Sequence, residues 1–120
     1  MKNQKKRAIL FSEGNFREVT SYLAKDAVWH VYEESQTIAG KEAIIAFGRQ
    51  IANYFASVAT QFETYGSLEE VNRVAVYGKA TFIRDGKTVS VIHSCDLYEF
   101  NEAELITQIH SYCNSHQTAP

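Results

Sequence analysis

Two long runs of strand-forming residues near the end of the chain most constrain how it can fold. The run TVSVIHSCDLYEF covers residues 88–100, the run LITQIHSY covers residues 105–112, and the polar sequence NEAE separates them. β-branched and aromatic residues predominate in both runs. Two such runs joined by a short polar segment are typical of an antiparallel hairpin. We therefore expect two neighbouring strands whose side chains alternate between the two faces of a sheet.

The expected pairing places several polar side chains on one face of this hairpin. It sets Asp96 opposite His110, or Tyr98 opposite His110 if the register slips by two residues. Gln108 and Tyr112 have the same parity as His110 and would share its face. An acid, an imidazole and two phenols thus project from one side in either register. If that side is concave it is a candidate catalytic surface, and if it faces water it has no such role.

The preceding sequence predicts helices followed by more antiparallel strands. The expected elements are a helix at residues 2–12, a short helix after Asn15, a strand at 27–32, a loop at 33–37, a helix at 40–55, a strand at 61–70, and two strands joined at Asp85-Gly86. Asp-Gly is a favoured pair for a tight hairpin turn. Helices separated from a run of long antiparallel strands indicate an α+β domain. We expect the helices to pack on a strongly curved, mostly antiparallel sheet and to enclose a pocket.

Alternation along the other strands predicts the walls of that pocket. Phe82 shares a face with Gly78 and Ala80, whose small side chains leave volume unfilled above the sheet. A pocket of this kind would take a small organic molecule that is apolar or partly polar. The residues expected to contact such a ligand are Trp29, Val31, Tyr54, Phe82, Tyr98, Gln108 and Tyr112.

Asp96 and His110 are the candidate catalytic pair. An apolar lid disfavours the charged form of a carboxyl group, whereas an adjacent imidazolium favours it. Such a pair suits general acid/base chemistry on an enolisable or hydroxylated small molecule. Tyr98 and Tyr112 would then donate hydrogen bonds to a carbonyl or enolate oxygen. The alternative is a buried polar network in which Asp96 and His110 only satisfy each other.

Composition and charge argue against other classes of function. The chain has 120 residues and a formal net charge of −2, and its basic residues are scattered apart from the triplet at residues 5–7. We therefore expect one domain and no nucleic-acid binding. No apolar run is long enough to span a membrane, and the N-terminus lacks the apolar core of a signal peptide. These absences predict a cytoplasmic protein that does not insert into a membrane.

The cysteines and histidines predict neither a disulfide nor a metal site. Cys95 and Cys113 are the two cysteines of a chain without a secretion signal, so free thiols are expected. Both have odd parity, which would place them on the face opposite Asp96. The four histidines have no metal-ligand spacing. We expect no metal and no cofactor.

Four segments of the chain together resemble a known superfamily. They are EGNF after the first helix, AKDAVWHVY, IAGKEAIIAF and DLYEFNEAELITQIHSY, and they look like the nuclear transport factor 2-like superfamily. The SnoaL-like polyketide cyclases and the ketosteroid isomerases are nearest in layout, over residues 6–114. The resemblance implies a single SnoaL-like domain over residues 1–120, folded as a cone-shaped α+β barrel around a deep apolar pocket. It also implies a homodimer formed through the outer face of the sheet.

Only some site positions of the resembling families carry over. The base carboxylate of the isomerase branch falls at Val31 and its oxyanion-binding tyrosine near Arg7, so that mechanism is not expected. The second oxyanion acid of that branch corresponds to Asp96 in DLYEF. The acid/base pair of the cyclase branch corresponds to Asp96 and His110. A final-strand carboxylate of many relatives corresponds to Asn114, whose amide cannot act as a base.

Two classes of function follow from these residues. The first is a cofactor-free enzyme that uses Asp96 and His110 to catalyse isomerisation, cyclisation or dehydration of a small molecule. The second is a non-catalytic ligand-binding or dimerisation domain with the same fold. A homodimer is expected from the residues as well, because Val91 and Leu97 make the odd face of the first hairpin strand apolar.

Overall fold

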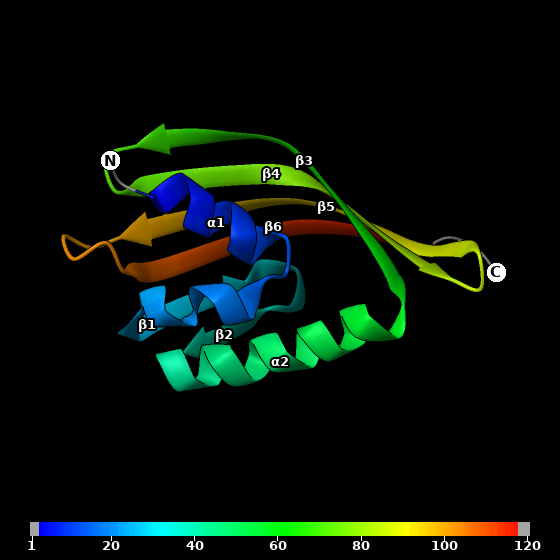
Figure 1. The fold of residues 1–120 in the computed structure, drawn as a ribbon, viewed down its shortest axis with the longest axis horizontal. Coiled ribbons are helices and arrows are strands. Elements are labelled where there is room, and N and C mark those ends of the chain that lie inside the picture. The colour runs from blue at the N-terminus through cyan, green and yellow to red at the C-terminus, as the bar shows by residue number, and fades with distance from the viewer. Residues whose placement is uncertain (1–2, 118–120) are drawn as a thin grey trace.

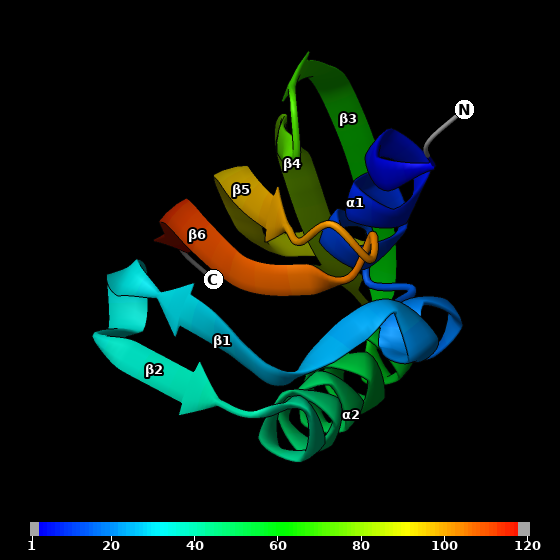
Figure 2. The ribbon, with the colours of Figure 1, turned by 90° about the vertical axis from the view of Figure 1, so that its left-hand side faces the viewer.

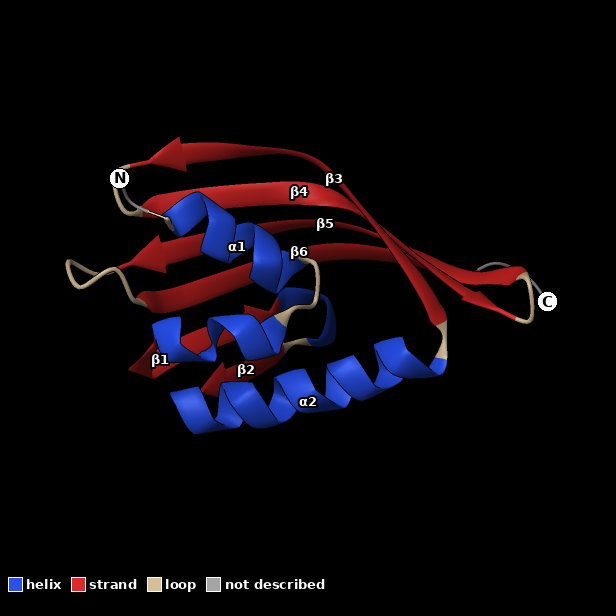
Figure 3. Ribbon diagram, in the orientation of Figure 1, coloured by secondary structure: helices blue, strands red, loops and turns tan. Residues whose placement is uncertain are grey.

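The computed structural model describes residues 3–117 of the chain. Helices precede and separate the first two strands, and four long strands make up the second half (Figure 1, Figure 3). In chain order the elements are α1 (Gln4–Ser12), the 3₁₀ helix η1 (Phe16–Tyr22), β1 (Leu23–Val31), the 3₁₀ helix η2 (Tyr32–Glu34), β2 (Gln36–Ala39), α2 (Lys41–Ser57), β3 (Ala59–Glu70), β4 (Arg73–Arg84), β5 (Lys87–Phe100) and β6 (Ile106–Gln117). None of the described helices is long and apolar enough to cross a membrane.

The six strands form one curved sheet in the order β2-β1-β6-β5-β4-β3. Neighbouring strands are antiparallel except for β1 and β6, which pair in parallel. Figure 2 shows the sheet curving around α1 and α2, which lie on its concave side. This arrangement confirms the α+β class and the mostly antiparallel sheet. Because the sheet curves without closing on itself, the helices complete the wall of the cone.

Turn chemistry fixes the hairpin between β4 and β5. Asp85 and Gly86 have φ angles of 54° and 77°, the left-handed values that a tight two-residue hairpin needs. The turn predicted there is confirmed. Residues 33–37 were expected to form a loop, but they do not. The helix η2 ends at Glu34, and the chain from Gln36 pairs with β1 as strand β2. Its polar sequence has no strand pattern of its own, so pairing with β1 imposes the extended conformation.

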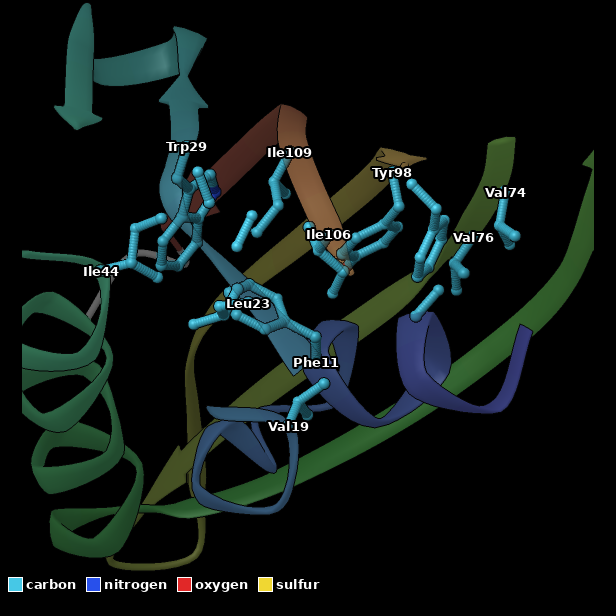
Figure 4. Close-up of a cluster of buried hydrophobic side chains, with 14 of the residues drawn as sticks. Phe11, Val19, Leu23, Trp29, Ile44, Val74, Val76, Tyr98, Ile106 and Ile109 are labelled. Carbon is cyan, nitrogen blue, oxygen red and sulfur yellow. The ribbon is translucent and has the colours of Figure 1, made fainter. Parts of the chain in front are cut away.

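Aromatic and aliphatic side chains from the helices and the sheet form one core (Figure 4). The ring of Phe11 has centroid distances of 4.8 Å to Phe16, 4.9 Å to Trp29 and 5.8 Å to Tyr98. All three contacts are edge-to-face, which is a preferred geometry for aromatic pairs. Ile44 of α2 is buried in the same cluster. This core anchors the helices to the concave face of the sheet.

A β-bulge in β6 determines which of its side chains face inward. Phe100 pairs with Ile106, but Glu99 pairs with Gln108, so Thr107 is an extra residue on the β6 side. The Thr107 hydroxyl donates a 3.1 Å hydrogen bond to the carbonyl oxygen of Glu99. One extra residue moves every later side chain of the strand to the opposite face.

The bulge corrects the register predicted for the terminal hairpin. Asp96 pairs with Ser111, and His110 lies opposite Leu97 rather than opposite Asp96 or Tyr98. In an antiparallel pair, opposed residues share a face. The even-numbered residues of β5 therefore share the inner face with odd-numbered residues of β6.

Candidate functional site

The concave face of the sheet and the helices enclose a cavity of about 520 Å³. Its helical side is mainly apolar and aromatic, with Phe11, Phe16, Phe47, Ile51, Tyr54 and Phe55, and it also includes the polar Ser12 and Gln50. Its sheet side carries hydroxyl, thiol and carboxyl groups, which belong to Ser90, Ser94, Asp96, Ser111, Cys113 and Ser115. An apolar wall with a few convergent polar groups is the usual composition of a small-molecule site.

A second hollow, of about 800 Å³, lies between η1 and α2. Its charged residues are Arg17, Glu18 and Arg49, all of which are exposed. The interior cavity instead carries a buried carboxyl group, and perturbed titratable groups in a cavity are typical of functional sites. Within residues 3–117, no group of three or more His, Cys, Asp or Glu side chains is placed to bind a metal ion. The interior cavity is therefore the candidate site.

Asp96 is at the centre of the polar part of the cavity. It is 8% exposed, and its Oδ2 accepts a 2.8 Å hydrogen bond from Ser12 Oγ at the end of α1. The same Ser12 oxygen lies 2.6 Å from the hydroxyl of Tyr98, which is fully buried. On β6, Ser111 forms a side-chain hydrogen bond with Asp96 and accepts a 2.9 Å hydrogen bond from the indole N–H of Trp29. Side chains from α1, β5 and β6 thus meet at one carboxyl group, and Trp29 of β1 joins them through Ser111.

Burial raises the pKa of the Asp96 carboxyl, and the hydrogen bonds from Ser12 and Ser111 partly offset that rise. None of the described residues that line the cavity is a lysine, an arginine or a histidine. Burial also raises the pKa of Cys113 to about 12, with a further contribution from the charge of Asp96. The Cys113 thiol is therefore protonated at neutral pH, and Asp96 is the buried group of the cavity that is suited to proton exchange.

His110 lies on the convex face of the sheet, which corrects its predicted pairing with Asp96. Its Nε2–H donates a 3.0 Å hydrogen bond to Oε2 of Glu99, and its Nδ1 lies 2.7 Å from the hydroxyl of Tyr32. The physical reason is the extra residue at Thr107, which turns His110 away from the inner face. The sheet itself separates the two proposed members of the catalytic pair.

Gln108 and Tyr112 share the convex face with His110 and are likewise not part of the cavity. Gln108 Oε1 lies 2.9 Å from Nε2 of His30, and the His30 ring stacks on His110 with centroids 4.8 Å apart. The Tyr112 ring stacks on Tyr32 at 4.8 Å and is about half exposed. The same bulge accounts for both corrections, because it moves all three predicted side chains of β6 outward together.

The other predicted contact residues lie at the cavity or close to it. Four of them form part of its wall, namely Trp29, Val31, Tyr54 and Phe82. Tyr98 is fully buried and contacts the polar network through Ser12. A role for these residues in ligand binding remains a prediction.

Several polar residues of the cavity were not predicted as site residues, among them Ser12, Ser111 and Cys113. Ser111 and Cys113 face inward because of the bulge, and Cys113 was expected on the opposite face. Both cysteines are free thiols, as expected. Ser12 is the last residue of α1, and only the packing of that helix on the sheet brings its hydroxyl to Asp96. No local pattern in the sequence marks Ser12.

Solved structures share this architecture over nearly the whole chain. A nuclear transport factor 2-like protein of unknown function from Cytophaga hutchinsonii ATCC 33406 aligns with a TM-score of 0.81 at 23% identity, over 95% of this chain and 99% of that one. A candidate polyketide cyclase from Sinorhizobium meliloti aligns with a TM-score of 0.66 at 13% identity, over 93% and 95% of the two chains. A candidate SnoaL-like polyketide cyclase from Shewanella putrefaciens CN-32 gives 0.72 at 12% identity, over 94% and 80%. At these identities the likeness is one of fold.

Comparison at the level of sequence gives the family. No curated protein matches the chain. The sequence model of the SnoaL-like domain matches residues 8–109, a span that runs from α1 into β6 and includes Asp96. The chain therefore belongs to the SnoaL-like domain family and has the nuclear transport factor 2-like fold.

Proposed function

We propose that the protein binds a small organic molecule in the interior cavity and that Asp96 exchanges a proton with it. The reaction is a cofactor-free isomerisation, cyclisation or dehydration. The placement of Asp96 carries this proposal, because a buried carboxyl group with two hydroxyl partners lies in the wall of an aromatic cavity. Membership of the SnoaL-like family, and the candidate polyketide cyclases among the structural neighbours, also support it.

The raised pKa of Asp96 suits proton transfer in both directions. A general acid or base is most effective when its pKa lies near the working pH, and burial moves the pKa of Asp96 upward from the usual range of a carboxyl group. In its protonated form the group can donate to a carbonyl or a leaving hydroxyl oxygen. In its ionised form it can accept a proton from an activated carbon atom.

Ser12 and Ser111 support both protonation states of Asp96. When the carboxyl is ionised, their hydroxyls donate hydrogen bonds that stabilise the charge. When it is protonated, a hydroxyl can rotate and accept, since each one is both donor and acceptor. The indole N–H of Trp29 donates to Ser111 and leaves the Ser111 hydrogen free to point at Asp96.

His110 has no part in this proposal. An acid/base pair needs both side chains in one cavity, whereas His110 contacts Glu99 and Tyr32 on the other side of the sheet. A single carboxyl group therefore replaces the predicted pair of Asp96 and His110.

A binding experiment tests whether the cavity takes a ligand. Trp29 is the one tryptophan of the chain and lines the cavity, so its fluorescence should report binding of small aromatic ketones, alcohols and amines. Ala80 also lines the cavity, and Ala80→Phe should block binding by filling it. Tyr112→Phe, on the convex face, is the matched control and should bind as the unmodified protein does. Binding that survives in Ala80→Phe contradicts the assigned site.

A proton-exchange experiment separates catalysis from binding alone. For a ketone that binds, deuterium incorporation next to the carbonyl in heavy water is followed by NMR. Asp96→Asn keeps the size of the side chain but replaces the carboxyl group by an amide that cannot act as acid or base, so exchange should slow by about 100-fold or more. Asp26→Asn removes an exposed carboxylate from β1 and should leave the rate unchanged. Binding without exchange in the unmodified protein favours the non-catalytic alternative.

A further inference from the structure

The cavity has a distinctive charge as well as a shape. Three of its described lining residues carry carboxyl groups, namely Glu33, Glu34 and Asp96, and none is a lysine, an arginine or a histidine. We propose that the molecule held in this cavity carries a positive charge, as a protonated aromatic or alicyclic amine does. This inference rests on the proposed ligand-binding function and names the substrate class of that site.

The polar groups of the cavity disfavour a negatively charged ligand. A buried charge without a partner is costly, and an anion would meet carboxyl groups with no cation to balance it. The hydroxyls of Ser12 and Ser111 are already engaged with Asp96. Ser90 and Ser94 are neutral donors that can hydrogen-bond an oxygen atom but do not neutralise a charge. Carboxylic acids and phosphates are therefore poor candidates.

The aromatic wall supplies a second attraction for a cation. Rings line both sides of the cavity, and they include those of Phe16, Trp29, Phe47, Tyr54, Phe55 and Phe82. Trp29 packs edge-on to Phe47, whereas Phe55 stacks on Phe82, so the rings have several orientations. Ring faces attract ammonium groups, most strongly where water is excluded. An amine with an apolar body fits this lining better than a uniformly polar molecule does.

Asp96 is placed to be the charge partner of such an amine. Its hydrogen-bond partners are the neutral hydroxyls of Ser12 and Ser111. A carboxylate offers about four acceptor positions, so an N–H of a bound ammonium group can join the two hydrogen bonds already present. Opposite charges in an apolar cavity each favour the ionised form of the other. The amine and the carboxyl group therefore stabilise one another's charge.

Glu33 and Glu34 form an acidic rim where the cavity meets solvent. Both are exposed on η2. Glu33 is fixed to β6, because its two carboxylate oxygens accept hydrogen bonds from the backbone N–H of Ser115 at 2.9 Å and from the Ser115 hydroxyl at 2.7 Å. Carboxylates at the mouth of a cavity raise the local concentration of cations. The rim and Asp96 thus favour the same sign of charge.

Three probes of similar size and different charge test this inference. Phenethylamine is a cation at neutral pH, phenethyl alcohol is neutral and phenylacetate is an anion, and binding of each is measured by the fluorescence of Trp29. We expect the amine to bind at least about tenfold more tightly than the alcohol, a difference of about 1.4 kcal/mol. Phenylacetate should bind most weakly.

Two variants locate the origin of the selectivity. Asp96→Asn should remove most of the preference for the amine over the alcohol, whereas Asp26→Asn, which removes an exposed carboxylate on β1, should leave their ratio unchanged. Circular dichroism confirms that each variant is folded. If Asp96→Asn does not fold, the ranking of the three probes on the unmodified protein still decides the question.

The possible results separate this inference from the function on which it rests. Equal or tighter binding of the alcohol or the acid overturns the positive charge and leaves ligand binding intact. An unchanged ratio in folded Asp96→Asn overturns the role of that carboxyl group as charge partner. If none of the three probes alters the Trp29 signal or the unfolding midpoint, both the inference and the ligand-binding function are overturned.

Discussion

Replacing Ser12 by alanine is a direct test of how the cavity holds its acid. Ser12 Oγ lies 2.8 Å from Oδ2 of Asp96 and 2.6 Å from the hydroxyl of Tyr98. Alanine removes this shared partner from two buried polar groups. Asp96 keeps its hydrogen bond with Ser111, whereas the Tyr98 hydroxyl loses its contact with Ser12 in a fully buried position.

The expected loss is about 2 kcal/mol in the free energy of unfolding. A buried polar group without a partner costs about 1–3 kcal/mol, and most of this cost falls on the Tyr98 hydroxyl. Tyr98→Phe alone removes one hydrogen bond and should cost about 1 kcal/mol. In the double variant the phenyl ring needs no partner, so the loss should be about 2 kcal/mol rather than the sum of about 3. A coupling of about 1 kcal/mol between Ser12 and Tyr98 is therefore expected.

Denaturant unfolding of the two single variants and the double variant measures this coupling. Ser57→Ala is the control, because Ser57 is exposed and its hydroxyl donates only to the carbonyl of Tyr54 near the end of α2. We expect that control to change stability by less than about 0.5 kcal/mol. Additive losses in the single variants refute the reasoning, since they would mean that the hydroxyls of Ser12 and Tyr98 do not depend on each other.

Substitutions on the two faces of the sheet should have different consequences. Burial raises the pKa of Asp96 above its unfolded value, so its stabilising contribution is present at low pH and is lost as the pH rises from about 4 through the folded pKa. Unfolding measured across this pH range should show that decline, and Asp96→Asn should abolish it. His110→Gln, on the convex face, should leave ligand binding in the Trp29 fluorescence assay unchanged. A loss of binding in this variant would show that His110 contributes to the ligand site. Leu97 lies opposite His110 on the convex face and is partly exposed. Leu97→Arg should therefore convert the proposed homodimer to monomers, as measured by sedimentation. If the unmodified protein is itself a monomer at micromolar concentration, the proposed dimer is wrong.

Features set by local chemistry could be predicted from the sequence. The Asp85-Gly86 turn forms because both residues tolerate positive φ, and the alternating runs on either side pair as β4 and β5. The helix expected at residues 40–55 is α2, observed at Lys41–Ser57, because its apolar residues repeat at helical spacing. Parallel pairing of β1 with β6 depends on segments far apart in the chain, and no local pattern predicts it.

The bulge at Thr107 was not predicted, and it determines much of the site. The loop between β5 and β6 precedes the bulge. Asn101 stabilises this loop, because its side-chain oxygen accepts hydrogen bonds from the backbone N–H groups of Ala103 and Leu105. The spacing of Ile106 and Ile109 was the one available signal. Both are fully buried although they lie three residues apart, and two strand residues at that spacing face the same core only when a bulge lies between them.

Small residues predicted the cavity lining less well than the alternation of side chains between the two faces of β4 and β5. Ala80 does line the cavity. Gly78 is small for a different reason, because a Cβ at that position would clash with the backbone carbonyl oxygen of Glu63 on β3. The close approach of two backbones requires glycine there. A glycine in a strand therefore needs a check against its neighbouring strand before it is assigned to a ligand site.

The partners of Asp96 fit the proposed proton exchange better than a purely structural role. A structural carboxyl group is usually stabilised by a cation or by backbone N–H groups, which lower its pKa and keep it ionised. Asp96 has two hydroxyl partners instead, Ser12 and Ser111, and these can donate to the carboxylate or accept from the acid. Burial meanwhile raises its pKa and makes its ionised form costly. His110 on the convex face is paired directly with Glu99, so the proton exchange that we propose is assigned to Asp96 alone, inside the cone.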